Sequence, residues 1–188
     1  MKSGQQIIHR DLIIKCKKGD RYAQNELYRL YAGAMYNISR RMLGNEDDAK
    51  DLLQEVFVDV YLKLHKLKEI STFSAWIKRI TVNKCINAIK KKRILAINMN
   101  EEMDFVDDSY DVDKPINHYE TAKIMQAIDN ISDGCRTVLN LYLFEGYDHK
   151  EIGQILSISE SASKSQYSKA KAKVRVLLEK QNIYGYGK

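Results

Sequence analysis

The sequence has 188 residues, of which 44% are hydrophobic and 30% are charged, a composition that fits one folded helical domain or two small ones. No apolar run approaches the roughly 18 residues that a membrane span needs, and the first residues lack the apolar core of a signal peptide, so we expect a cytoplasmic protein. The net charge of +6 divides into +10 over residues 1–93, −6 over residues 94–118 and +2 over residues 119–188, which predicts two polyanion-binding units and an acidic linker.

The N-terminal part of the chain predicts two helices. Residues 10–18 form the first helix and residues 21–43 the second, with a turn at Gly19-Asp20 between them. The second helix carries apolar side chains, several of them tyrosines, at three- and four-residue steps. Aromatic residues at that spacing usually pack inside a protein, so we expect these tyrosines in the core.

The stretch from Leu43 to Leu64 predicts a third helix. Acidic residues occupy its first turn, where their negative charge interacts favourably with the exposed backbone N–H groups. One buried stripe is expected from the helical spacing of Ala49, Leu52, Leu53, Val56, Phe57, Val60 and Leu64. Asp51, Gln54 and Glu55 fall outside this stripe, on a face that is either simply solvated or used to bind a partner.

A loop over residues 66–72 and a basic helix ending at Arg93 follow. The apolar face of this helix is formed by Phe73, Trp76, Ile77, Ile80, Ile86 and Ile89. The remaining positions are rich in Lys and Arg and end in the run Lys90–Arg93. Such a helix either presents a plain solvated surface or lies along the phosphates of a nucleic acid.

The acidic stretch over residues 94–118 shows no helical periodicity and includes Pro115, so we expect a linker there. Beyond it, residues 119–131 and 136–145 have the apolar spacing of two more helices.

A helix-turn-helix pattern closes the chain. Asp148 and Glu151 have the spacing of a capping box at the start of its first helix. The chain turns over residues 157–159, and Ser159 is placed to cap a long helix that ends near Lys180. Ser163 adds a hydroxyl to the inward row of that helix, where it weakens packing unless it bonds back to a helix carbonyl.

Cys16, Cys85 and Cys135 lie far apart, and the four histidines are scattered. A structural zinc site needs clustered ligands, and an odd number of separated cysteines fits reduced thiols. No Walker loop, dinucleotide fingerprint or nucleophile–base spacing is present. We therefore expect no metal, no cofactor, no small-molecule ligand and no enzymatic activity.

The segment DDAKDLLQEVF, residues 47–57, resembles the polymerase-binding helix of the extracytoplasmic-function (ECF) sigma factors, in the sigma-70 family of bacterial RNA polymerase. The preceding AQNELYRLYAGAMYNISRRMLGNEDDA resembles the start of the same core domain. The resemblance implies docking on the clamp helices of the largest polymerase subunit. It assigns polymerase binding to Asp51, Leu52, Gln54, Glu55 and Phe57.

The segment FSAWIKRITVNKCINAIKKKR, residues 73–93, is similar to the family segment that melts promoters and reads the minus-ten element. Family members often have Asp where this chain has Asn87. The resemblance assigns DNA contacts in this region to Ser71, Thr72, Trp76, Lys78, Arg79, Asn83, Asn87, Lys90 and Lys91.

The C-terminal part resembles the second domain of ECF sigma factors, with matches at Glu145-Gly146, Glu151-Ile152 and Ile158-Ser159. Ser161-Ala162-Ser163 stands where Gly-Thr-Val is common, and Gln166 stands where Arg is common. The smaller number of guanidinium groups indicates base reading at this end that differs from the family norm. The resemblance assigns contacts with the minus-thirty-five element to Arg136, Glu160, Ser161, Lys164, Ser165, Ser168, Lys169 and Lys171.

These resemblances imply an all-α protein of two small helical domains joined by an acidic flexible linker. Residues 1–93 would bind core polymerase and the minus-ten region, residues 94–118 would form the linker, and residues 119–188 would read the minus-thirty-five region. The implied partners are core RNA polymerase, promoter DNA and an anti-sigma factor, which many relatives have in membrane-anchored form. The residues alone leave two alternatives: a helix-turn-helix regulator that binds DNA without polymerase, and a nucleic-acid enzyme, which no carboxylate cluster supports.

Overall fold

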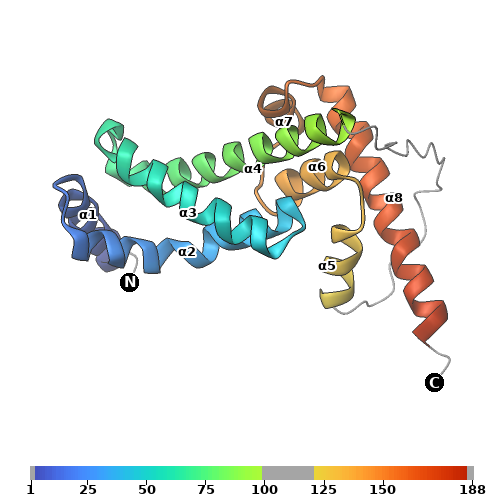
Figure 1. Ribbon diagram of the computed structural model, residues 1–188, viewed down its shortest axis with the longest axis horizontal. Helices are drawn as coiled ribbons and strands as arrows, with labels where there is room; N and C mark the ends of the chain where they lie inside the picture. The colour runs from blue at the N-terminus through green and yellow to red at the C-terminus, as the bar shows by residue number, and fades with distance from the viewer. Residues whose placement is uncertain (1–2, 99–120, 186–188) are drawn as a thin grey trace. The chain divides into compact units, whose positions relative to one another are not determined.

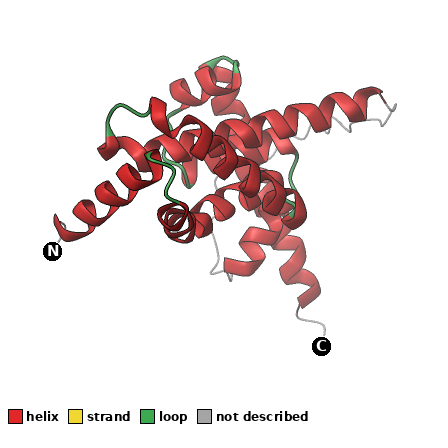
Figure 2. Cartoon of the chain, turned by 60° about the vertical axis from the view of Figure 1, so that its left-hand side comes forward, coloured by secondary structure: helices red, strands yellow, loops and turns green. Residues whose placement is uncertain are grey.

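The computed structural model describes residues 3–98 and 121–185, and every regular element in these ranges is a helix (Figures 1 and 2). The chain divides into two compact units, residues 1–89 and residues 90–188. The predicted fold class, all-α with two small helical domains, is confirmed. Over the described ranges, no helix combines the length and the hydropathy that crossing a membrane requires.

Residues 3–98 contain six helical elements, and the boundary between the two units falls inside the last of them. They are α1 (Ser3–Lys17), α2 (Arg21–Leu43), α3 (Glu46–Lys63), the 3-10 turns η1 (Leu64–Lys66) and η2 (Ile70–Thr72), and α4 (Phe73–Asn98). Because α4 continues beyond Arg93, residues 94–98 of the expected linker are helical. The rest of that linker, residues 99–118, lies outside the described residues.

Side-chain and glycine caps fix the boundaries of α2 and α3. The Asp20 carboxylate accepts a hydrogen bond from a backbone N–H in the first turn of α2. Gly44 ends α2 with a φ of 71°, a left-handed conformation that favours glycine. Asn45 then caps α3 by accepting from the N–H groups of Asp47 and Asp48, at 2.9 and 3.0 Å.

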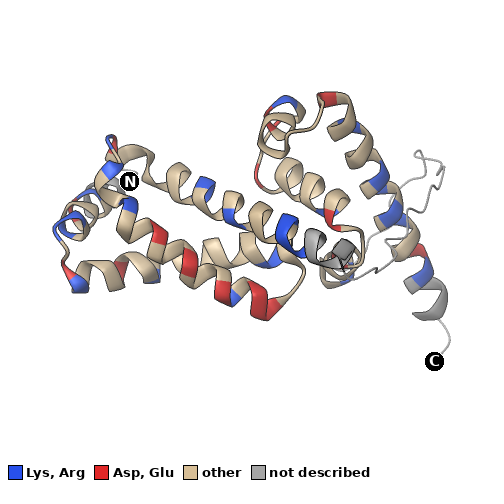
Figure 3. Cartoon of the chain, turned by 45° about the horizontal axis from the view of Figure 1, so that its top comes forward, with Lys and Arg blue, Asp and Glu red and all other residues tan. Residues whose placement is uncertain are grey.

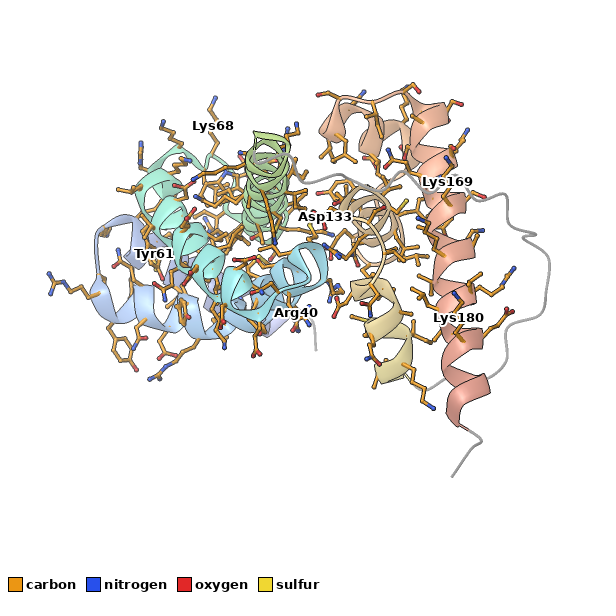
Figure 4. The ribbon with its side chains drawn as sticks, turned by 45° about the vertical axis from the view of Figure 1, so that its right-hand side comes forward. Arg40, Tyr61, Lys68, Asp133, Lys169 and Lys180 are labelled. Atoms are coloured by element: carbon orange, nitrogen blue, oxygen red, sulfur yellow. The ribbon has the colours of Figure 1, made fainter. Side chains whose placement is uncertain are left out.

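Helices α2 and α3 pack against each other and supply much of the core of this unit. The stripe predicted on α3 is buried: Ala49, Leu52, Leu53, Val56, Phe57 and Val60. Tyr28 packs on Phe57 with ring centroids 4.7 Å apart, and the Tyr61 hydroxyl donates to the Gln24 carbonyl at 2.7 Å (Figure 4). Tyr22 and Tyr28 are 76% and 38% exposed, so the prediction that the tyrosines of α2 pack in the core is wrong for these two residues.

The second unit contains α5 (Thr121–Asp129), α6 (Asp133–Leu143), α7 (His149–Leu156) and α8 (Glu160–Gly185). Helix α8 packs against α5, α6 and α7. One cluster of its core consists of Ile128, Ile131, Cys135, Leu139 and Ala170. Helix α6 begins at Asp133, earlier than the predicted start at Arg136, and Ser132 occupies its N-cap position.

The helix-turn-helix between α7 and α8 has the predicted caps. Asp148 and Glu151 form a complete capping box at the start of α7. The Ser159 hydroxyl accepts from the N–H of Ala162 at 3.0 Å and caps α8. Ser163 is fully buried, and its hydroxyl bonds to Nδ1 of His149 at 3.0 Å rather than only facing apolar neighbours.

Candidate functional site

The polar face predicted on α3 is exposed. Asp51, Gln54 and Glu55 all lie at the surface, and the acidic residues of this helix are coloured red along the ribbon in Figure 3. Leu52 and Phe57, which the resemblance also assigned to polymerase binding, are 5% and 3% exposed. Their side chains therefore pack in the core beneath this face, where a partner protein cannot contact them.

Lys84 of α4 connects this face with the next helix. Its ammonium group lies 3.1 Å from a carboxylate oxygen of Glu55 and 3.5 Å from one of Asp59. A hydrogen bond from Lys63, together with the charge of Lys84, lowers the pKa of Asp59. Lys84 thus forms an ion pair with Glu55, whose side chain is 67% exposed on this face.

Two large apolar side chains continue the exposed face along α3. Val58 and Leu62 are 57% and 66% exposed and follow Asp51 and Glu55 at helical spacing. Neither residue is among the site residues predicted from the sequence. Their position just outside the buried stripe was a usable signal, because apolar residues there have no place in the core.

The residues expected to meet the minus-ten region fall mainly on one row of α4 and the turn before it. Members of this row recur at three- and four-residue steps and are Thr72, Trp76, Arg79, Asn83, Asn87 and Lys90. All are exposed except Trp76, which is half-buried and packs against Phe73 with ring centroids 5.9 Å apart. The row offers an aromatic ring, two amides and two cations to a polyanion.

The remaining residues of that set lie beside this row. Ser71 and Lys91 are exposed, whereas Lys78 is half-buried and lies on another side of α4. The Thr72 hydroxyl donates to the Glu69 carbonyl at 2.7 Å, which closes the turn η2 before the helix begins. The turn thus has a defined shape at the end of the row.

On α8, the residues expected to meet the minus-thirty-five element are mostly exposed. Exposed members are Glu160, Ser161, Lys164, Ser165, Lys169 and Lys171, and Ser168 is half-buried. Lys169 extends from the outer side of the helix in Figure 4. The Lys171 ammonium lies 5.0 Å from the centroid of the Tyr167 ring, a cation–π contact that fixes its direction.

Glu160 and Lys164 form an ion pair in the first turns of α8, with nitrogen and oxygen 2.7 Å apart. The hydrogen bond between them lowers the pKa of Glu160 and raises the pKa of Lys164. Both side chains are solvent-exposed, so the pair is weak and Lys164 is able to exchange it for a base or a phosphate.

Arg136 is the clearest departure from the expected DNA contacts. Its residue surface is 6% exposed, and it donates to the carbonyls of Asp129 at 2.9 Å and Ile131 at 3.2 Å. It also pairs with the Asp133 carboxylate. Arg136 therefore caps the end of α5 from inside the unit, a role at odds with the expected phosphate contact.

Among the described residues, no group of three or more His, Cys, Asp or Glu side chains is placed to hold a metal. Cys16, Cys85 and Cys135 are buried and form no disulfide bond. Burial raises the pKa of the Cys16 thiol to about 11, so it is a thiol rather than a thiolate at neutral pH.

Comparisons with known proteins match both units in order. A model of sigma-70 region 2 matches residues 27–94, and a model of sigma-70 region 4 matches residues 121–174. The ECF RNA polymerase sigma factor SigW of Bacillus subtilis is 28% identical over 174 residues, which cover 87% of this chain and 92% of the relative. The chain belongs to the ECF sigma factors.

Other relatives of this sigma factor agree. The ECF RNA polymerase sigma factor SigE of Mycolicibacterium smegmatis is 28% identical over 161 residues, covering 84% of this chain and 62% of the longer relative. Among solved structures, the sigma factor RpoE of Bartonella quintana, in complex with the anti-sigma factor NepR, has a TM-score of 0.55 at 18% identity. The match covers 82% of this chain and 96% of RpoE, and it shows the shared fold.

Proposed function

We propose that this ECF sigma factor binds core RNA polymerase and directs it to specific promoters, without catalytic chemistry of its own. The observation that carries the proposal is the region 2 match over residues 27–94, which includes a helix with an exposed acidic face. On this face Asp51, Gln54 and Glu55 would meet the polymerase clamp. An exposed carboxylate and amide at helical spacing present acceptors and donors that suit a polar interface.

Promoter opening is assigned to the row on α4 and to the loop of residues 66–73. A flipped base needs polar groups and a stacking surface to replace its partner strand. Trp76 supplies a ring, and Thr72, Asn83 and Asn87 supply polar groups on the same side. The cations at Arg79 and Lys90 would hold phosphates.

The first turns of α8 would enter the major groove at the minus-thirty-five element. In a helix-turn-helix the start of the second helix reaches the base edges. Ser161, Lys164 and Ser165 are exposed in these turns. Lys169 and Lys171 lie further along and would contact phosphates.

We also propose an anti-sigma factor as a partner of this protein, acting with it in the cytoplasm. The support is the structural likeness to RpoE, which is described in complex with the anti-sigma factor NepR. A regulator that binds DNA without polymerase is not favoured, because the match to region 2 spans α3 and most of the described α4.

Transcription in vitro tests the proposal. Core polymerase is supplied with the full chain and a promoter library randomised over both elements. We expect transcripts only when both components are present, and we expect the transcribed templates to share an upstream and a downstream motif. Sequence-specific DNA binding by the chain alone, with no transcription after addition of core polymerase, would support the DNA-only regulator instead.

A further inference from the structure

Helix α1 lies outside both family matches, which begin at residue 27 and residue 121. It nevertheless belongs to the first unit, since Ile13 and Cys16 are 2% and 4% exposed. Its contacts include α2 and both 3-10 turns, η1 and η2. These turns form the segment that precedes α4.

Lys17 in the last turn of α1 makes a direct hydrogen bond to that segment. Its half-buried ammonium donates to the backbone carbonyl of Leu67, which lies between the two turns and 50 residues away in sequence. Leu67 is itself 6% exposed. A charged donor makes a stronger bond than a neutral one, so this contact resists opening of the segment.

A second connection reaches the other end of the segment. Nδ1 of His9 lies 3.1 Å from the Tyr31 hydroxyl, which lies 3.1 Å from Oγ of Ser74. The Tyr31 ring also packs edge-on against Phe73, with centroids 5.0 Å apart. Helix α1 is thereby linked through Tyr31 to the first turn of α4.

We propose that α1 is a positioning element, in which Lys17 and the His9–Tyr31 pair hold residues 66–73 in the shape that receives the opened promoter strand. The proposal rests on the function assigned above to this loop. In this role Lys17 acts through the Leu67 carbonyl to which its ammonium donates, and not through a contact of its own with DNA. Fixing a binding loop in advance lowers the ordering cost of capturing a single strand.

The first test uses the free full-length protein and requires no polymerase. Lys66 and Lys68 are exposed trypsin sites inside the segment, and Lys68 extends away from it in Figure 4. We expect Lys17→Met to speed cleavage after Lys68 by about fivefold, the effect of losing one hydrogen bond that holds the segment closed. The matched control is Lys18→Met, which removes the same charge from an exposed neighbour.

The second test measures promoter opening by the reconstituted holoenzyme, from permanganate reactivity of unpaired thymines. Lys17→Met should slow opening by about fivefold at unchanged affinity for core polymerase, and Lys18→Met should match the wild type. Equal cleavage of the two variants after Lys68 would overturn the proposal. So would faster cleavage of Lys17→Met without slower opening.

Failure of the proposed function gives a different result, because then the wild-type protein itself would not open a promoter. If Lys17→Met does not fold, Tyr31→Phe carries the same two tests. That variant keeps the ring against Phe73 and loses the hydroxyl that joins His9 to Ser74. Wild-type cleavage and opening by Tyr31→Phe would then overturn the proposal.

Discussion

Two buried polar side chains of the second unit show how single residues shape the helix-turn-helix. Arg136 donates to the carbonyls at the end of α5, and Ser163 bonds to His149 between α8 and α7. Leaving such a group buried without a partner costs about 1–3 kcal/mol. Both residues therefore hold the helices that support α8 in place, although their sequence positions suggested other roles.

Ser157 is expected to destabilise the turn that it forms. Its φ of 59° lies in the left-handed region, which is strained for a residue with a side chain. We expect Ser157→Gly to raise the free energy of unfolding by about 0.5–1 kcal/mol, measured by urea denaturation of the full chain. A decrease would contradict the assigned conformation.

Gly153, in the same helix-turn-helix, is a position where adding a side chain should destabilise the protein. A Cβ at this position would lie 2.8 Å from the carbonyl oxygen of Ile158, closer than such atoms approach in proteins. Gly153→Ala should therefore lower the free energy of unfolding in the experiment that shows a gain for Ser157→Gly.

Tyr61 should make the first unit sensitive to alkaline pH. Burial raises its pKa to about 12, from 10.0 for an ordinary tyrosine. Because the pKa of the folded state is the higher one, the stabilisation is complete below pH 10 and is lost as the pH rises towards 12. The free energy of unfolding should fall across this range, and less steeply in Tyr61→Phe. Identical profiles would show that ionisation of Tyr61 is not linked to folding.

At the scale of elements, helical periodicity and capping residues were sufficient to predict most of the fold. The bounds of α2, the buried stripe of α3 and the capping box of α7 all agree with the prediction. Where the resemblance and the periodicity disagreed, at Leu52 and Phe57, the structure follows the periodicity. Arg136 was not predictable in this way, because a long charged side chain folds back onto carbonyls that only tertiary structure brings near.

Two lysines of α8 should affect DNA binding differently, one through base recognition and the other through phosphate contact. Lys164 lies in the turns proposed to reach base edges, so Lys164→Ala should weaken binding to the preferred upstream element by about 10- to 100-fold and flatten the preference at one base pair. Lys171→Ala should weaken all sequences alike and reduce the salt slope by about one unit. Affinities of the holoenzyme for a panel of upstream variants at several salt concentrations provide the comparison. Equal loss on every variant for Lys164→Ala would make it a phosphate contact.

A substitution on α4 should slow promoter opening without weakening binding to closed duplex DNA. Asn83 is exposed in the row of α4 that we propose to face the opened strand. We expect Asn83→Ala to reduce the rate of promoter opening by about tenfold while binding to closed duplex changes little. Asn37→Ala, an exposed asparagine on α2, is the matched control. An equal loss in both steps would show that Asn83 has only a structural role.

At the scale of the whole molecule, each surface has a different charge and a different proposed partner. Acidic residues gather on α3, the proposed polymerase-binding helix, whereas α4 and α8, the proposed DNA-binding helices, carry many Lys and Arg residues (Figure 3). Lys84 connects the two helices of the first unit, because its ammonium group on α4 forms an ion pair with Glu55 on α3. We therefore propose that polymerase binds the exposed face of α3, and that DNA binds the exposed row of α4 in the first unit and the first turns of α8 in the second.

The most direct test of this account is the affinity of the full chain for core polymerase in the absence of DNA. Charge reversal at two exposed positions, Asp51→Lys with Glu55→Lys, should leave the melting temperature nearly unchanged, since exposed substitutions usually cost under about 0.5 kcal/mol. Lys84→Met breaks the same ion pair without changing the face and serves as the control. We predict that the double variant loses at least about tenfold in affinity while Lys84→Met stays near the wild type. Wild-type affinity of a folded double variant would contradict the assignment of α3 as the polymerase-binding helix.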